Sequence, residues 1–155
     1  GATARVVQGV SQEFRRFASA MPSLIAVREG IKTLRYGGAI LEAHPGDMVV
    51  FPAHLAADVG NRVARSGPYV GELLAFDPDF LLAHAAAHPA ATPRQPLRQP
   101  ALLARPSEGL AQAFRAAADA LIADPPLPTS TGTSARRFTA SRRACSASAS
   151  ASIDS

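Results

Sequence analysis

The sequence predicts a mainly β domain, an antiparallel sandwich or barrel of short strands that is followed by two α-helices. In residues 1–76, short apolar or alternating segments recur at regular intervals, separated by turns that contain Gly and Pro. In residues 77–124, apolar residues recur at helical spacing on both sides of a Pro-rich link. Residues 125–155 are mainly Ser, Ala, Thr and Arg, a composition that cannot bury enough apolar surface to fold. We therefore expect a barrel, a helical dimerisation region of the same domain, and a low-complexity, disordered tail.

Each expected strand ends at a turn signal. Gly37 and Gly38 mark a hairpin, because Gly adopts the positive φ values that tight turns require. Pro45–Asp47 marks a second turn. Such short connections join antiparallel strands. The expected strands are Glu13–Phe17, Leu24–Val27, Lys32–Tyr36, Ala39–Ala43, Met48–Phe51, Asp58–Val63 and Tyr69–Phe76.

Two helices are expected after the strands. The first begins at Asp77, whose side chain can cap a helix, with Pro78 in the first helical position, and it ends before Pro89. Residues 90–104 contain three prolines and predict an extended link. The second helix lies between the prolines at positions 106 and 125.

The second helix carries an apolar stripe with spacings of four, three and four residues: Leu110, Phe114, Ala117 and Leu121. This stripe can pack on the barrel, or it can pair with a second subunit, since its spacing is that of a coiled-coil seam. Two heptads are too few to decide between these interpretations. The four residues are therefore candidate dimerisation residues.

Charge and cysteine content exclude several classes of protein. Residues 129–155 hold four arginines and one aspartate, so they carry +3 of the net charge of +4 and leave the folded part nearly neutral. A nearly neutral domain lacks the basic surface that nucleic-acid binding requires. The single cysteine, Cys145, can form neither an internal disulfide nor a zinc cluster. Because the sequence also lacks a membrane span and a signal peptide, we expect a cytoplasmic protein.

The tail has a second possible origin, as a frame-shifted continuation of the gene. The sequence contains 15 Arg and one Lys, which indicates GC-rich coding DNA. Reading such DNA out of frame tends to give Ser, Arg and Ala, the residues that dominate the tail.

One segment resembles the second conserved motif of the cupins, a family of small β-barrels. Gly46, Pro52 and Asn61 stand where that motif has Gly, Pro and Asn. His54 stands in the place of a second Gly, and Ala57 in the place of a metal-binding His. The resemblance implies a jelly-roll type of barrel, and it implies that one metal ligand has been lost.

The first cupin motif would supply two His and a Glu as further ligands. The corresponding positions hold Phe17, Ser19 and Ser23, which do not bind metals well. A metal-dependent cupin enzyme would lose its chemistry without these ligands. We therefore expect no metal, no cofactor, no catalytic residues and no enzymatic activity.

The order of the turns and strands resembles the sensor domain of AraC-type transcription regulators, over residues 24–124. The matching segments are Val27–Gly30, Pro45–Asp47, Phe51–Pro52, Asp58–Asn61, Gly67–Tyr69 and Phe76–Pro78. In that family the barrel takes a small effector or a partner protein, and the helices pair two subunits. A C-terminal region with two helix-turn-helix units binds DNA. The resemblance implies an effector-sensing, homodimeric domain that reaches DNA only through a C-terminal domain absent from this chain.

Three side chains are candidates for effector binding. Tyr36 and Tyr69 have an apolar ring and a polar tip suited to a cavity wall, and His54 lies at a strand end near the expected barrel mouth. Ordinary barrel packing is the alternative role for each. Two other functions stay open, a small stand-alone cupin enzyme and a module that binds a protein partner. A barrel with a filled interior would favour the partner-binding module.

Overall fold

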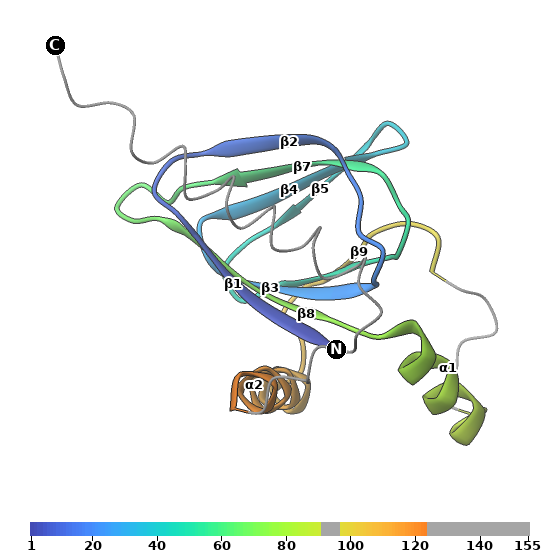
Figure 1. The fold of residues 1–155 in the computed structure, drawn as a ribbon. Coiled ribbons are helices and arrows are strands. Elements are labelled where there is room, and N and C mark those ends of the chain that lie inside the picture. Colours follow the sequence, from blue (N-terminus) through green and yellow to red (C-terminus); the bar gives the residue numbers. More distant parts are fainter. Residues whose placement is uncertain (91–96, 124–155) are drawn as a thin grey trace, which may run out of the picture. The chain divides into compact units, whose positions relative to one another are not determined.

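The structure, a computed structural model, describes residues 1–90 and 97–123, and the expected tail lies outside these residues. In this part of the chain, two antiparallel sheets lie face to face (Figure 1). Sheet A consists, from edge to edge, of β1 (Ala2–Gln8), β8 (Tyr69–Ala75), β3 (Ser23–Glu29), β6 (Met48–Phe51) and β9 (Ala101–Leu103). Sheet B consists of β2 (Gln12–Phe17), β7 (Ala57–Arg62), β4 (Ile31–Tyr36) and β5 (Ala39–Ala43).

The mainly β, antiparallel fold with two helices is confirmed, and it has the form of a jelly-roll-like sandwich. The chain crosses repeatedly between the sheets, since β1, β3, β6 and β8 belong to one and β2, β4, β5 and β7 to the other. The sandwich does not close into a barrel. Strands β1 and β2 are edge strands of different sheets, and no backbone pairing joins them among the described residues.

Alternating side chains of sheet A form two separate cores. On β3, Ile25 and Val27 point toward sheet B, whereas Ala26 points to the opposite face, because successive residues of a strand face opposite sides. The inner cluster between the sheets consists of Ile25, Val27, Leu34, Ala43, Val49, Phe51, Ala57, Val59 and Tyr69. The outer cluster lies on the other face of sheet A and consists of Ala26, Met48, Leu74 and Phe114.

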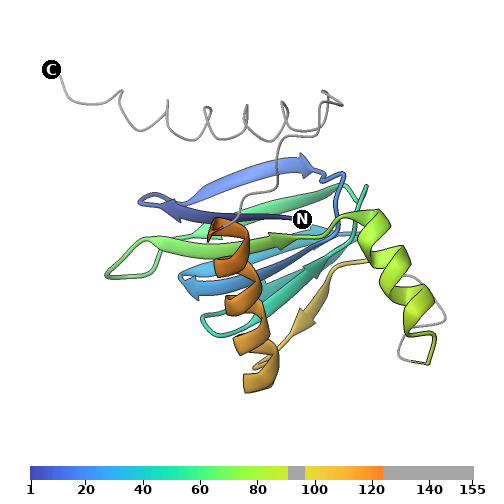
Figure 2. The ribbon, with the colours of Figure 1, turned by 60° about the horizontal axis from the view of Figure 1, so that its bottom comes forward.

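Helix α2 (Glu108–Ala123) lies across the outer face of sheet A (Figure 2). Phe114 attaches it, because this side chain is 2% exposed and packs on Met48 and Leu74. Ala117 and Leu121 are partly buried against the same cluster. Packing on the sheet therefore occupies most of the predicted apolar stripe.

Helix α1 (Pro78–Ala87) begins as the sequence predicts. The Asp77 side chain accepts a hydrogen bond from the backbone N–H of Asp79 at 2.8 Å. No residue of α1 is buried, and Phe80 and Leu82 are exposed. No side chain of α1 therefore belongs to the inner or the outer cluster.

Strand β9 departs from the prediction of an extended link across residues 90–104. Its three residues pair with β6, with Leu103 opposite Met48. Leu103 also packs against the outer cluster. A strand of three residues that follows several prolines has no local pattern of its own, so its conformation depends on pairing with β6.

The position where the cupin motif has its second Gly has a left-handed backbone. His54 lies there in a turn and has φ of 57°. Its backbone N–H donates to the Ser19 carbonyl oxygen at 2.7 Å, which fixes the turn against the β2–β3 connection. A non-Gly residue in this conformation is strained, although His tolerates it better than most residues.

The effect of a substitution at His54 on the free energy of unfolding should therefore depend on how well the new residue adopts positive φ, and little on the chemistry of its side chain. We expect His54→Val to lower the free energy of unfolding by about 1–2 kcal/mol, because a β-branched residue is least compatible with positive φ. We expect His54→Gly to lower it by less than about 0.5 kcal/mol, since relief of strain offsets the flexibility of Gly. Urea unfolding monitored by circular dichroism measures both. Equal losses in the two variants would contradict this account.

Candidate functional site

The three predicted effector contacts lie in different places. Tyr69, at the start of β8, is 1% exposed and lies near Lys32 in the first half of β4. Tyr36 is at the other end of β4, about 13 Å along the strand from Lys32, and is partly exposed. His54 is exposed in its turn. Of the three, only Tyr69 lies within the inner cluster.

Lys32 lies beside Tyr69 with its amine buried between the sheets. The residue is 7% exposed, and its Nζ lies 5.7 Å from the centre of the Tyr69 ring. Nζ donates a hydrogen bond to Oδ1 of Asn61 at 3.0 Å. Within residues 1–90 and 97–123, no carboxylate lies within ion-pair distance of this amine. In the described part of the chain, this buried cation is thus matched only by a neutral amide and an aromatic ring.

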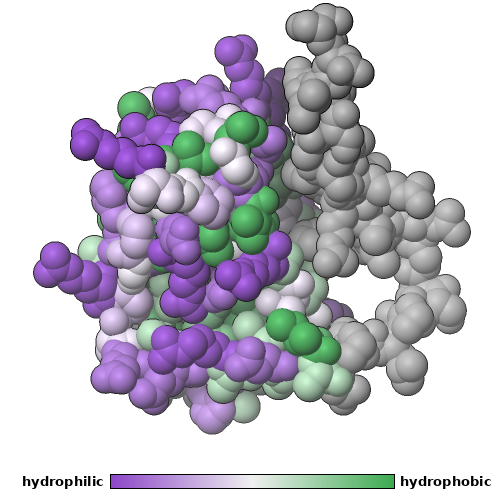
Figure 3. Space-filling model, turned by 90° about the vertical axis from the view of Figure 1, so that its left-hand side faces the viewer, coloured by the Kyte–Doolittle hydropathy of each residue, from purple (hydrophilic) through white to green (hydrophobic). Residues whose placement is uncertain are grey.

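A chain of side-chain amides continues from this lysine. Nδ2 of Asn61 donates to Oε1 of Gln8 at 2.9 Å, and Nε2 of Gln8 donates to Oε1 of Gln12 at 2.7 Å. Strand register explains the arrangement, since Asn61 pairs with both Lys32 and Gln12, and Gln8 pairs with Tyr69. We call these five residues the polar cluster. It lies at the end of the sandwich that carries the β1–β2 and β7–β8 connections, where the surface is mainly hydrophilic (Figure 3).

An apolar layer lies next to the polar cluster, two residues further along each strand. In sheet B this layer contains Phe14, Val59 and Leu34, which are in register across β2, β7 and β4. In sheet A, Val6 and Val27 flank Gly71 on β8. The interior therefore changes from polar to apolar within about 7 Å.

Gly71 allows the Tyr69 ring to lie along the inner face of β8. A Cβ atom at this position would lie 2.5 Å from Oη of Tyr69, so any other residue would displace the ring. Among the described residues, no buried side-chain oxygen or nitrogen atom lacks a hydrogen-bond partner. The Tyr69 ring therefore occupies the space that Gly71 leaves open, with its hydroxyl group beside this glycine.

Burial changes the pKa of both titratable groups in the polar cluster. It lowers the pKa of Lys32 to about 8, because the charged amine loses its contact with water. It raises the pKa of Tyr69 to about 12, because the phenolate would be the buried charge. Near pH 7 the cluster therefore presents an ammonium group and a neutral phenol, both hydrogen-bond donors. Such a pair of donors suits an anionic or acidic ligand.

The sequence contained a signal for Lys32 that the predictions above do not use. Side chains alternate between the two faces of β4, so Lys32 and Leu34 lie on one face and Thr33 and Arg35 lie on the other. Once Leu34 is assigned to the core, the period of two places Lys32 inside as well. Asn61 was identified only as part of the cupin motif, and its contact with Lys32 gives it a role in the polar cluster.

A depression with a volume of about 140 Å³ lies on the outer face of sheet B, away from the polar cluster. Its walls carry charges of both signs, and some of these charged side chains already interact with other groups of the protein. Arg35 lies 3.5 Å from a carboxylate oxygen of Glu13, and Asp58 accepts from the backbone N–H of Arg16 at 2.8 Å. Because its charges are balanced, this surface favours no class of ligand.

Metal-binding groups do not cluster in the described residues. No set of three or more His, Cys, Asp or Glu side chains is placed to hold a metal ion there. His84 and His88 lie on α1 with ring centres 4.6 Å apart, and the Phe80 ring stacks on His84. No helix in this part of the protein is long and apolar enough to cross a membrane.

Comparison with known proteins identifies similar folds but no family. No protein-family model matches the sequence, and no curated protein matches it either. Among solved structures, ToxT from Vibrio cholerae matches with a TM-score of 0.55 at 7% identity, over 75% of this chain and 46% of ToxT. The AraC-like transcriptional activator CuxR matches with a TM-score of 0.53 at 14% identity, over 99% of this chain and 53% of CuxR. At such low identities, these TM-scores show a shared fold alone.

Two of the matching ToxT structures contain a ligand. One holds an unsaturated fatty acid, with a TM-score of 0.52 at 6% identity, over 74% of this chain and 44% of that chain. The other holds (E)-4-(8-methylnaphthalen-1-yl)but-3-enoic acid, with a TM-score of 0.54 at 7% identity, over 92% of this chain and 52% of that chain. The present chain thus spans about half the length of the regulators that it matches.

The lowered pKa of Lys32 predicts a stability that depends on pH. The unfolded chain keeps this proton up to about pH 10.5, whereas the folded protein releases it near pH 8, so the unfolded state binds more protons in between. We therefore expect the free energy of unfolding to rise by about 2 kcal/mol from pH 8 to pH 10. Above pH 10, Tyr69 should lower the free energy of unfolding, because the folded protein keeps the phenol proton to a higher pH than the unfolded chain does.

Denaturant unfolding at a series of pH values measures this dependence. Lys32→Met should abolish the rise between pH 8 and pH 10. Arg35→Met, at an exposed position on the same strand, should leave it unchanged. A rise that persists in Lys32→Met would show that other groups cause it.

Proposed function

We propose that this chain is the effector-sensing and dimerisation domain of an AraC-type transcription regulator. The jelly-roll-like fold and the two following helices support this proposal, as do the matches to ToxT and CuxR. Because the match covers about half of each regulator, we assign DNA binding to the other half of such a protein. The proposed domain acts in the cytoplasm and without catalysis, by shifting its population of conformations when an effector binds.

The effector is a small molecule that carries an acidic group, and Lys32 is the observation that supports this class. Its amine is buried without an acid partner in the described residues. A carboxylate placed beside it would match the charge and accept hydrogen bonds from both Lys32 and Tyr69. The ligands of the two ToxT complexes are carboxylic acids, which agrees with this class.

Dimerisation uses the part of α2 that sheet A leaves uncovered. Phe114 faces the sheet, so it supports the helix and does not reach a partner. Leu110 is 37% exposed and Ile122 is 70% exposed, and both remain available to a second subunit. Leu110 is the member of the predicted stripe that we retain as a direct dimer contact.

A module that binds a protein partner is the second candidate function. The packed inner cluster favours it, since an effector would have to open the sandwich slightly to reach Lys32. A stand-alone cupin enzyme is less favoured, because Ser23 and Ala57 replace residues that would bind its metal.

Binding of a simple acid tests the effector proposal. We expect undecanoate to bind the protein in isothermal titration calorimetry at pH 7, and 1-undecanol to bind far more weakly. Lys32→Met should weaken undecanoate binding about 10–100-fold, the contribution of a charge-assisted hydrogen bond in a buried site. Binding should also weaken above pH 8, as the amine loses its proton.

The matched control is Arg35→Met, which removes an exposed positive charge outside the interior. It should bind undecanoate as the wild type does. Equal binding by wild type and Lys32→Met would rule out the role of Lys32. Absence of any binding would leave the partner-binding module as the better function.

The dimer proposal predicts different effects for substitutions at two residues of the apolar stripe, Leu110 and Phe114. We expect Leu110→Glu to weaken the dimer at least tenfold in sedimentation equilibrium without changing the fold, because the side chain is partly exposed. Phe114→Ala should instead lower stability by about 3–5 kcal/mol, as a buried aromatic side chain is lost. Leu82→Glu on α1 is the matched control and should leave the dimer intact. A monomeric wild type would refute dimerisation.

A further inference from the structure

We propose that His84 and His88, at the C-terminal end of α1, together chelate one divalent transition-metal ion at the surface of the protein. This site lies on the helix, outside the sandwich, and is independent of the effector proposed above. It is also separate from the metal site of the cupins, where positions such as Ser23 and Ala57 lack ligands. The bound ion stabilises the last turn of α1.

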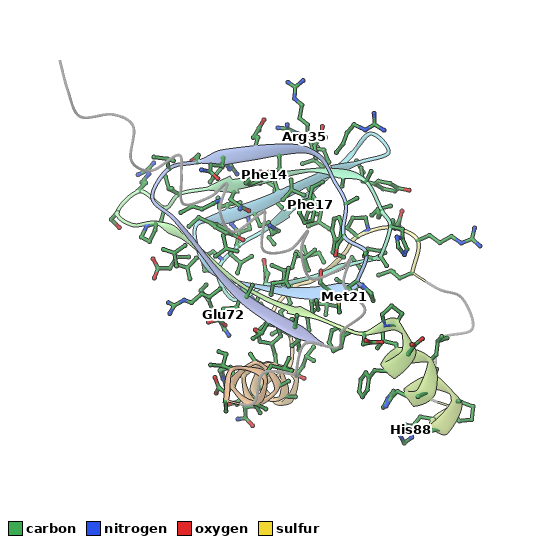
Figure 4. All side chains as sticks on the ribbon, viewed as in Figure 1. Phe14, Phe17, Met21, Arg35, Glu72 and His88 are labelled. Carbon is green, nitrogen blue, oxygen red and sulfur yellow. The ribbon has the colours of Figure 1, made fainter. Side chains whose placement is uncertain are left out.

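One turn of helix connects the two histidines. The backbone N–H of His88 donates to the carbonyl oxygen of His84 at 3.0 Å, which is the bond between residues four apart in an α-helix. Side chains four residues apart lie on the same face of a helix, one above the other. Both histidines are exposed, and Figure 4 shows His88 at the end of α1, away from the two sheets. A metal ion can therefore approach the pair from solvent.

The separation of the two rings suits a shared ion. Their centres are 4.6 Å apart, and their planes are inclined by 46°. A ligating imidazole nitrogen lies about 2.1 Å from its metal ion, which places the ion about 3.2 Å from the centre of the ring. Two ring centres 4.6 Å apart then form an angle of about 90° at the ion. This is the angle between neighbouring ligands in octahedral and tetragonal coordination, which Cu²⁺ and Ni²⁺ adopt.

The Phe80 ring holds the His84 ring in position. Phe80 precedes His84 by one turn, and the two rings are stacked, with centres 6.2 Å apart and planes inclined by 23°. A ligand side chain that is already held by packing loses less conformational freedom when it binds the ion. Phe80 is 60% exposed and belongs to neither the inner nor the outer cluster. We therefore assign it the role of a positioning residue.

The end of α1 at which the histidines lie favours a cation. Aligned peptide dipoles place a partial negative charge at the C-terminal end of a helix. Helix α1 contains no Lys or Arg, so no positively charged side chain of this helix repels the ion. No residue of α1 is buried, and the helix is short, so its last turn depends on local interactions. A chelate between His84 and His88 adds such an interaction.

The two imidazole groups define the class of ion. Imidazole suits Cu²⁺, Ni²⁺ and Zn²⁺, whereas Mg²⁺ and Ca²⁺ require oxygen ligands. Among these ions, Cu²⁺ binds most tightly to a given set of nitrogen ligands. In the described residues, no set of three or more His, Cys, Asp or Glu side chains is placed to hold a metal ion. Water therefore occupies the remaining coordination positions, and the ion binds reversibly.

Titration with Cu²⁺ alone tests this site. We expect protein with Cys145→Ser, in which the single thiol cannot compete, to bind one Cu²⁺ per chain in isothermal titration calorimetry. The electron paramagnetic resonance spectrum of the bound ion should show two nitrogen ligands. His84→Ala and His88→Ala should each weaken binding at least tenfold, because the second ligand of a chelate acts at a high effective concentration. His44→Ala, which removes an exposed histidine elsewhere, is the matched control and should bind as the parent does.

A change of spacing separates chelation from binding by independent histidines. His88→Ala combined with Ala86→His keeps the number of histidines but moves the second ring to another face of the helix, since residues two apart do not face each other. This variant should bind Cu²⁺ as weakly as His88→Ala does. Binding as tight as that of the parent would overturn the proposal, as would one ion per two chains or no binding to the parent.

The role of Phe80 has a separate readout. Phe80→Leu should weaken Cu²⁺ binding about two- to tenfold, the effect of one additional side chain to immobilise, while the spectrum still shows two nitrogen ligands. Unchanged affinity in Phe80→Leu would show that its ring does not position His84.

Discussion

Sheet A is covered on both faces, and this constraint determines the composition of its strands and the place of α2. Strand β3 sends Val27 toward sheet B and Ala26 toward α2, so that it has no face for polar residues in its middle. Strand β4 in sheet B has one covered face and can place Arg35 outside. Because Phe114 packs on the back of the sheet that carries Tyr69, the polar cluster and α2 are separated by one layer of strands.

Local signals in the sequence were sufficient for most of the fold. Gly37 marks the hairpin between β4 and β5, Gly46 marks the turn where the chain crosses from β5 to β6, and both have positive φ. Asp77 and Pro78 predict the start of α1 because capping depends on adjacent residues. Strand β9 could not be predicted, since its conformation depends on pairing with β6, about fifty residues earlier in the chain.

The candidate site was predicted less completely than the fold. Tyr69 was identified because an aromatic ring with a polar tip suits a cavity wall. The period of two along β4 places Lys32 on the core face, but its hydrogen bond to Asn61, and that of Asn61 to Gln8, depend on the register of strands that are distant in sequence. The stripe on α2 shows the same limit. Spacing alone places Leu110 and Phe114 on the same face of the helix. Only the packing on sheet A shows that Phe114 is buried and that Leu110 is exposed.

Burial of the Lys32 amine lowers the stability of the fold near pH 7. Lowering its pKa from 10.5 to about 8 corresponds to about 3 kcal/mol of unfavourable free energy near pH 7. A typical domain has only about 5–15 kcal/mol of stability in total. The amide chain from Asn61 accepts one hydrogen bond from the amine and supplies no negative charge. A bound carboxylate would supply both the charge and further acceptors, and would raise the pKa of Lys32 again. By the same linkage, the proposed site would discriminate between an acid and its neutral analogue, because only the acid offsets the cost of burying the charged amine.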